Sequence, residues 1–117
     1  MSTLKVTNIQ ATGETASRAV SGVAAAWIHL DATTATIENS NNISSVADNG
    51  TGSFTHTYSN ATSDADVAVG HATRNRTVIR YLDTTSTSSF SHLTETAGGG
   101  VNEDDPNTCL VIMGDLA

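Results

Sequence analysis

The chain is short of the residues that build a large interior. Its 117 residues include one Trp, two Tyr and two Phe, and hydrophobic residues make up 38% of the sequence. A domain of this length buries about two-thirds of the surface of its unfolded chain, so few large apolar side chains mean a modest core. We therefore expect part of its stability to come from burying an apolar face against copies of itself.

Cysteine and basic residues are also few. Cys109 is the one cysteine, which excludes an intrachain disulfide, and its position in an apolar run predicts a small core residue. Five Lys and Arg against twelve Asp and Glu give a net charge of −7, which disfavours nucleic acid as a partner. Since the sequence has no apolar run of about 18 residues and no apolar signal segment, we expect a protein made in the cytoplasm that does not insert into membranes.

Ser and Thr take the place of the missing apolar bulk, at roughly a quarter of the chain; Thr favours strands and Ser favours turns. From Val23 onward, short apolar or alternating runs are separated by Asn, Asp, Gly and Ser at intervals of roughly 8–12 residues, which is typical of a sandwich or barrel. No segment has a sustained helical period. The predicted strands are 23–31, 34–38, 43–47, 52–59, 67–71, 77–83, 88–93 and 108–114.

The sequence therefore predicts one all-β domain, an antiparallel β-sandwich or jelly-roll-like fold, over residues 24–117. Residues 1–23 are predicted to form an N-terminal arm, in which Leu4, Val6 and Ile9 are the candidate anchoring residues. Residues 11–26, rich in Ala, Ser, Thr and Gly, predict a linker with at most a helical turn.

Two segments are predicted to form exposed loops. Asp48–Gly52 has the Asn-Gly chemistry of a tight strand connection, and it precedes an alternating strand whose Phe54, His56 and Tyr58 are predicted to share a buried face. Gly98–Asp105 combines glycines with three consecutive acids, which predicts a mobile, solvated loop. The candidate host-facing residues of these loops are Asp48, Asn49, Gly50, Thr51, Gly52, Gly99, Asn102, Glu103 and Asp104.

No pattern in the chain predicts catalysis or a cofactor. There is no nucleophile elbow, no phosphate-binding glycine loop and no Cys-x-x-Cys, so we expect no catalytic residue and no enzyme activity. Four histidines, His29, His56, His71 and His92, lack the spacing of metal ligands, so we predict hydrogen-bonded, half-buried side chains and no metal site within one chain. A site shared between subunits stays open.

Arg74, Arg76 and Arg80 form most of the basic charge. They are candidate contacts to an anionic partner, and the alternative is that they decorate a turn and pair with Asp83 or its neighbours. Trp27, between Ala26 and Ile28, is predicted to be a core residue, with sugar stacking as the alternative.

The order of segments resembles the terminal module of bacteriophage tail-fibre proteins. Residues 26–31 (Ala-Trp-Ile-His-Leu-Asp) resemble its opening Ala-Trp-Val-Asn-Phe-type strand, and residues 42–59 resemble its Asn-Val-Ser-Ser-Val-x-Asp-Asn-Gly-Thr-Gly-x-Tyr-x-Val-x-Phe segment. Residues 64–69 are similar to the Asp-Ala-x-Tyr-x-Val strand that follows, and residues 110–117 to the usual last strand. The resemblance spans about residues 24 to 117.

This resemblance implies a homotrimeric, receptor-facing, sandwich-like knob on the virion surface. Its implied partners are other virion proteins and a host surface glycan or protein. In that family the module ends a longer chain, whereas here about two dozen residues precede it, so we expect anchoring through the short arm of residues 2–23 or through a face of the knob. The alternative is a capsid decoration, cement or head-fibre protein, seated as trimers on the major capsid protein.

Overall fold

The chain folds from strands and turns. The computed structural model describes residues 2, 5–9, 18–19, 24–74, 77–81, 85–98 and 100–117, with the backbone alone for residues 8–9, 18–19 and 80–81. This described part contains strands in antiparallel sheets and no helix, which confirms the predicted all-β class.

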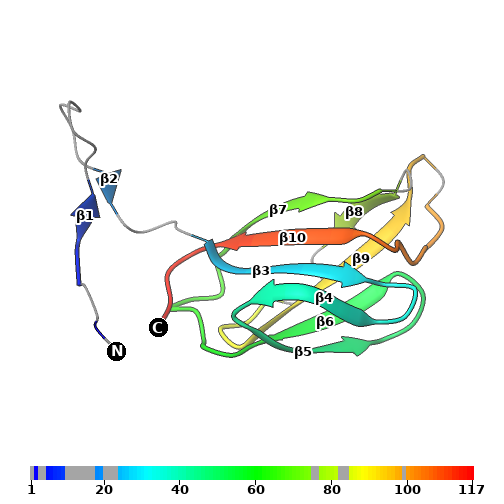
Figure 1. Cartoon of the computed structure of the whole chain (residues 1–117). Helices are drawn as coiled ribbons and strands as arrows, with labels where there is room; N and C mark the ends of the chain where they lie inside the picture. The colour runs from blue at the N-terminus through cyan, green and yellow to red at the C-terminus, as the bar shows by residue number, and fades with distance from the viewer. Residues whose placement is uncertain are drawn as a thin grey trace.

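Eight of the described strands build two four-stranded sheets with the orders β4-β3-β10-β7 and β5-β6-β9-β8. Figure 1 shows the two sheets stacked as the layers of a sandwich, and the predicted strands lie where expected within a few residues. Their bounds are β3 Ala24–Asp31, β4 Thr36–Asn41, β5 Ile43–Asp48, β6 Ser53–Tyr58, β7 Ala68–Ala72, β8 Thr77–Tyr81, β9 Ser89–Thr96 and β10 Thr108–Met113.

The N-terminal segment contains a small sheet of its own. Strand β1 (Asn8–Ile9) pairs antiparallel with β2 (Arg18–Ala19). Figure 1 shows both beyond the end of the sandwich at which the C-terminus lies. The predicted linker of residues 11–26 is thus wrong for 18–19, which pair with 8–9, whereas the start of β3 at Ala24 agrees with the strand predicted for 23–31. The remaining arm residues 10–17 and 20–23 lie outside the described residues.

The core lies between the sheets and follows the two-residue period of the strands. From one sheet, β3 and β10 contribute aliphatic side chains; from the other, β6 and β9 contribute rings. Phe54, His56 and Tyr58 are all buried, so the predicted inner face of β6 is confirmed. The buried apolar cluster comprises Ala26, Ile28, Leu30, Ala32, Ile43, Phe54, Tyr58, Phe90, Leu110 and Ile112.

Two predicted core residues lie on the outside instead. Ile28 and Leu110 pair across β3 and β10 and point inward, so their neighbours Trp27 and Cys109 are directed to the opposite, outer face. Both are half-buried and neither belongs to the core cluster. The predictions of a core Trp27 and a core Cys109 are wrong because a continuous apolar run conceals which alternate residues face water.

The predicted tight turn at Asp48–Gly52 is present between β5 and β6. Gly50 and Gly52 have φ angles of 119° and 74°, which side chains disfavour. The Asn49 amide donates to the Ser53 carbonyl at 2.9 Å, and the Ser53 amide donates to the Gly50 carbonyl at 2.8 Å. The Asp48 carboxylate accepts from the Gly50 amide at 2.8 Å, so the first residue of the turn also stabilises it.

Gly52 is the position in this turn that tolerates substitution least. A Cβ atom there would lie 2.4 Å from the Thr94 carbonyl oxygen, whereas one at Gly50 would meet nothing within 4 Å. An alanine at either position would have backbone strain of about 1–2 kcal/mol, because both φ angles are positive. We expect Gly52→Ala to lower the free energy of unfolding by about 1–3 kcal/mol more than Gly50→Ala. Only the methyl group at position 52 would push the turn away from the backbone of Thr94. Urea unfolding of both variants measures the difference; equal losses would refute the close contact.

Candidate functional site

Four connections gather at the end of the sandwich opposite β1 and β2, which we call the distal end. Strands β3, β5, β7 and β9 finish there, as the antiparallel registers require. In Figure 1 the connections after β3 and β9 form this end, while the small N-terminal sheet lies at the other. The turn and the loop that were predicted to face a host therefore lie at one end of the molecule.

Hydrogen bonds join that turn and that loop. The Gly52 amide donates to the Asp104 carboxylate at 2.6 Å, and the Gly52 carbonyl accepts from the Thr94 amide at 2.8 Å. The Thr94 carbonyl in turn accepts from the Glu103 amide at 3.0 Å. The strand β9 thus lies between the two predicted segments and links them.

The candidate residues of these segments differ in exposure. Asp48, Asn49, Gly50, Thr51 and Asn102 are exposed, Glu103 and Asp104 are half-buried, and Gly52 is buried. Gly99 lies outside the described residues. The exposed surface at this end is therefore polar, with an added apolar side chain at Val101, 61% exposed.

The prediction of a mobile, solvated loop is wrong for its second half. Asp105 has no exposed surface. Its carboxylate accepts from the Thr77 hydroxyl at 2.6 Å, the Asn107 amide at 2.7 Å and the Arg74 amide at 3.4 Å. Its carbonyl accepts from the Ala32 amide at 3.0 Å. Asp105 therefore ties the β9–β10 connection to the connections that follow β3 and β7.

A second carboxylate shapes the turn after β3. The Asp31 carboxylate accepts from the Thr33 hydroxyl at 2.5 Å and from the Thr33 amide at 2.9 Å. The hydroxyl contact is the main reason that the pKa of Asp31 lies below its ordinary value. This exposed side chain stays ionised and adds to the negative charge of the distal end.

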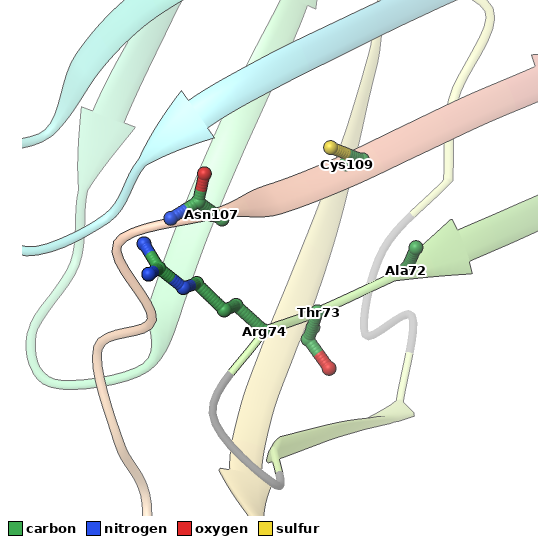
Figure 2. Close-up of a pocket in the computed structure, with 5 residues that line it drawn as sticks. All are labelled: Ala72, Thr73, Arg74, Asn107 and Cys109. Atoms are coloured by element: carbon green, nitrogen blue, oxygen red, sulfur yellow. The ribbon is translucent and has the colours of Figure 1, made fainter.

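Of the three predicted arginine contacts, the structure locates one side chain. Arg74 is exposed at the distal end, just after β7. It borders a shallow, open depression of about 330 Å³ that is lined by Ala72, Thr73, Arg74, Asn107 and Cys109. Figure 2 shows the Arg74 guanidinium turned toward the carboxamide of Asn107. Arg76 and Asp83 lie outside the described residues, and Arg80 is described by its backbone alone.

The predicted anchoring residues lie at the other end or outside the described part. Val6 is 45% exposed, Ile9 is described by its backbone within β1, and Leu4 lies outside the described residues. The arm and the distal loops are thus separated by the length of the sandwich (Figure 1).

Two of the four histidines form a buried pair, where half-buried side chains were predicted. His56 Nε2 and His92 Nδ1 are 2.8 Å apart, one donating and the other accepting, on the inner faces of β6 and β9. Their rings stack between Phe90 and Phe54, with centroids 4.5 Å apart for His56 and Phe90. Among the described residues, His56 Nδ1 and His92 Nε2 are buried with no hydrogen-bond partner.

This environment opposes protonation of both rings. Burial, and secondarily the charge on His92, lowers the pKa of His56 to about 3. Burial, and secondarily the charge on His71, lowers the pKa of His92 to about 4. Burial likewise raises the pKa of Tyr58 to about 12. Within the described part of the chain, no three His, Cys, Asp or Glu side chains come together where they could hold a metal ion.

The histidine pair predicts loss of stability in mild acid. In the unfolded chain both rings take up protons near pH 6.5, whereas the folded protein resists until about pH 4 and then about pH 3. The free energy of unfolding should fall as the pH drops from 6.5 toward 4, by up to about 1.4 kcal/mol per pH unit for each histidine. In urea unfolding across this range, His56→Phe/His92→Phe should show a shallower pH dependence. His29→Gln should keep the pH dependence of the unmodified protein. If the double variant also kept it, the buried histidine pair would not be its cause.

The fold defines an all-β protein of two stacked antiparallel sheets. Neither protein-family models nor curated proteins nor solved structures gave a match. No helix of membrane-spanning length and hydropathy occurs in the described segments.

Proposed function

We propose that this chain is a structural protein of a tailed bacteriophage particle that attaches to the host surface as a trimeric, tail-fibre-tip-like module. It acts by binding, without catalysis or a cofactor, on the virion surface. The observation that carries the proposal is the separation of a short arm at one end from polar loops at the other. An attachment module needs this polarity, since one end joins the particle and the other meets the host.

The resemblance of residues 24–117 to tail-fibre terminal modules supports the same proposal. So does the way the distal loops are held. Asp104 and Asp105 fix the loops by hydrogen bonds, so little conformational entropy would be lost when they bind a partner. A loop surface ordered before binding suits recognition better than a mobile one.

The outer faces of the two sheets differ, which supports the trimer. On one sheet, Trp27 and Val111 pair across β3 and β10, beside Met113. Val111 and Met113 are 40% and 37% exposed, and neither residue is charged. On the other sheet, the outward side chains of β6 and β9 include hydroxyl groups such as those of Thr55 and Ser91, which lie 2.8 Å apart. In a chain of net charge −7, copies repel one another least across an uncharged patch, and we assign the trimer contact to the patch of Trp27, Val111 and Met113, away from Asp31 at the distal end of β3.

A pair of valines with equal exposure tests this contact. Val111→Lys should convert the trimer to monomers, because the assembly would have to bury three added charges. Val78 is 41% exposed on β8 of the other sheet, and Val78→Lys should leave the trimer intact. Sedimentation velocity measures both. A monomeric unmodified protein, or equal effects of the two variants, would overturn the assignment.

Binding of purified protein to host cells tests the attachment function. Thr51→Lys combined with Asn102→Lys changes two exposed distal residues and should abolish binding, whereas Ser63→Lys, exposed near the opposite end, should not. Deletion of residues 2–20 should leave cell binding intact and prevent incorporation into particles. Cell binding that survives the distal double substitution would refute the role of this end.

Copy number separates this function from capsid decoration. A handful of copies per particle, measured by quantitative mass spectrometry, is expected for an attachment module. Hundreds of copies would instead assign the protein to the capsid lattice and remove the tail location from the proposal.

A further inference from the structure

The depression beside Arg74 combines a cation, an amide and an apolar wall. It lies at the distal end of β7 and β10, where Ala72 and Cys109 are cross-strand partners. Figure 2 shows Arg74 and Asn107 turned toward one another along one side of it, with Ala72 and Cys109 on the neighbouring strands.

Arg74 carries one of the few positive charges of an acidic protein. The chain has twelve acidic and five basic residues, yet among the described residues no carboxylate pairs with the Arg74 side chain. Its backbone amide donates to the Asp105 carboxylate at 3.4 Å. A guanidinium carries five N–H donors in a planar fork that matches the two oxygens of a carboxylate.

Asn107 supplies a second donor on the same side. Its Oδ1 lies 3.2 Å from His29 Nε2, which orients the carboxamide and leaves Nδ2 without a partner among the described residues. The nearby Thr73 hydroxyl is used elsewhere, since it donates to the Thr77 carbonyl at 2.5 Å. The side-chain N–H groups of Arg74 and Asn107 are therefore the donors left for a ligand, and together they favour an acceptor such as a carboxylate.

The remaining lining is apolar and shallow. The methyl group of Ala72 and the thiol of Cys109 suit C–H groups rather than a second charge. A ligand that fits has one carboxylate next to an apolar face. A pyranose ring with a carboxylate at its edge has this form, and one negative charge meets less repulsion from this acidic chain than a doubly charged phosphate does.

We infer that the Arg74–Asn107 depression binds the carboxylate of an acidic sugar of the uronic acid type. This inference rests on the proposed attachment function and names the ligand class of the distal end. Three copies of the site in a trimer would bind a repeating acidic polysaccharide much more tightly than one copy binds a single sugar.

Chemical-shift mapping on the full, isotope-labelled protein tests the inference. Titration with glucuronate and with short galacturonate oligomers should shift the amide signals of residues 72–74 and 107–109, with a dissociation constant on the order of millimolar for the single sugar. Glucose, which lacks the carboxylate, should leave these signals in place. Equal shifts with glucose would overturn the carboxylate assignment.

Three substitutions sharpen the test. Arg74→Gln should weaken glucuronate binding about tenfold, and Arg74→Lys should weaken it less because it keeps the charge and loses the fork. Asn107→Asp keeps an acceptor for His29 and should abolish binding by repelling the carboxylate. Arg18→Gln makes the same charge change in β2, at the other end, and should bind normally. Undiminished binding by Arg74→Gln would overturn the site.

The outcome is separable from that of the proposed function. Host-cell binding without glucuronate binding would remove the acidic-sugar site and leave the attachment function standing. Glucuronate binding by a protein that attaches to no host cell would keep the acidic-sugar site and remove the attachment function.

Discussion

The fold depends on the contact between five rings on one sheet and a few aliphatic side chains on the other. Phe54 and Phe90 have no exposed surface, and they pack in the same cluster as Ile28, Leu110 and Ile112. The chain has few aromatic residues, and His56 and His92 supply the remaining rings of this layer. The His56 imidazole stacks on Phe90 and on the His92 imidazole. The core thus includes two buried nitrogens that have no hydrogen-bond partner among the described residues, and its stability is therefore sensitive to acid.

The rigidity of the distal end follows from where this core stops. Beyond the last inward side chains, hydrogen bonds replace apolar contacts, and Asp105 accepts several of them at once. A buried carboxylate is a poor way to gain net stability, because its desolvation offsets much of what its hydrogen bonds contribute. Its hydrogen bonds instead fix the relative positions of the connections after β3, β7 and β9. The neighbouring Asp104 joins the turn at Gly52 to the same loop, so this turn and the surface beside Arg74 keep a fixed relation.

Sequence reasoning succeeded where the signal is local and periodic. The alternation of Phe54, His56 and Tyr58 predicted a buried face, and the Asn49-Gly50 pair predicted a turn, since both depend on neighbouring residues alone. It failed for Trp27 and Cys109, because a continuous apolar run does not show which alternate residues face the core and which face water. The left-handed corner at Asn42, with φ of 57° and side-chain bonds to Ala25 and Asn60, was not predicted.

The candidate site was predictable only in pieces, because its contacts join distant segments. The turn and the acidic loop were each identified, but the bond from the Gly52 amide to Asp104 spans 52 residues and depends on the register of β6 and β9. The burial of Asp105 had one local signal that went unused: its carboxylate accepts the Asn107 amide two residues on, a turn that Asp forms readily. The depression beside Arg74 had no local signal, since Ala72 and Cys109 meet only through strand pairing.

The charge of the chain and the chemistry of its distal depression act over different distances. A net charge of −7 repels polyanions over the whole surface, but salt screens that repulsion beyond about 10 Å at 0.1 M ionic strength. The Arg74 fork and the Asn107 amide act at hydrogen-bond distance, where screening is weak and geometry decides. An acidic protein can therefore reject nucleic acid in general while accepting one carboxylate at one point.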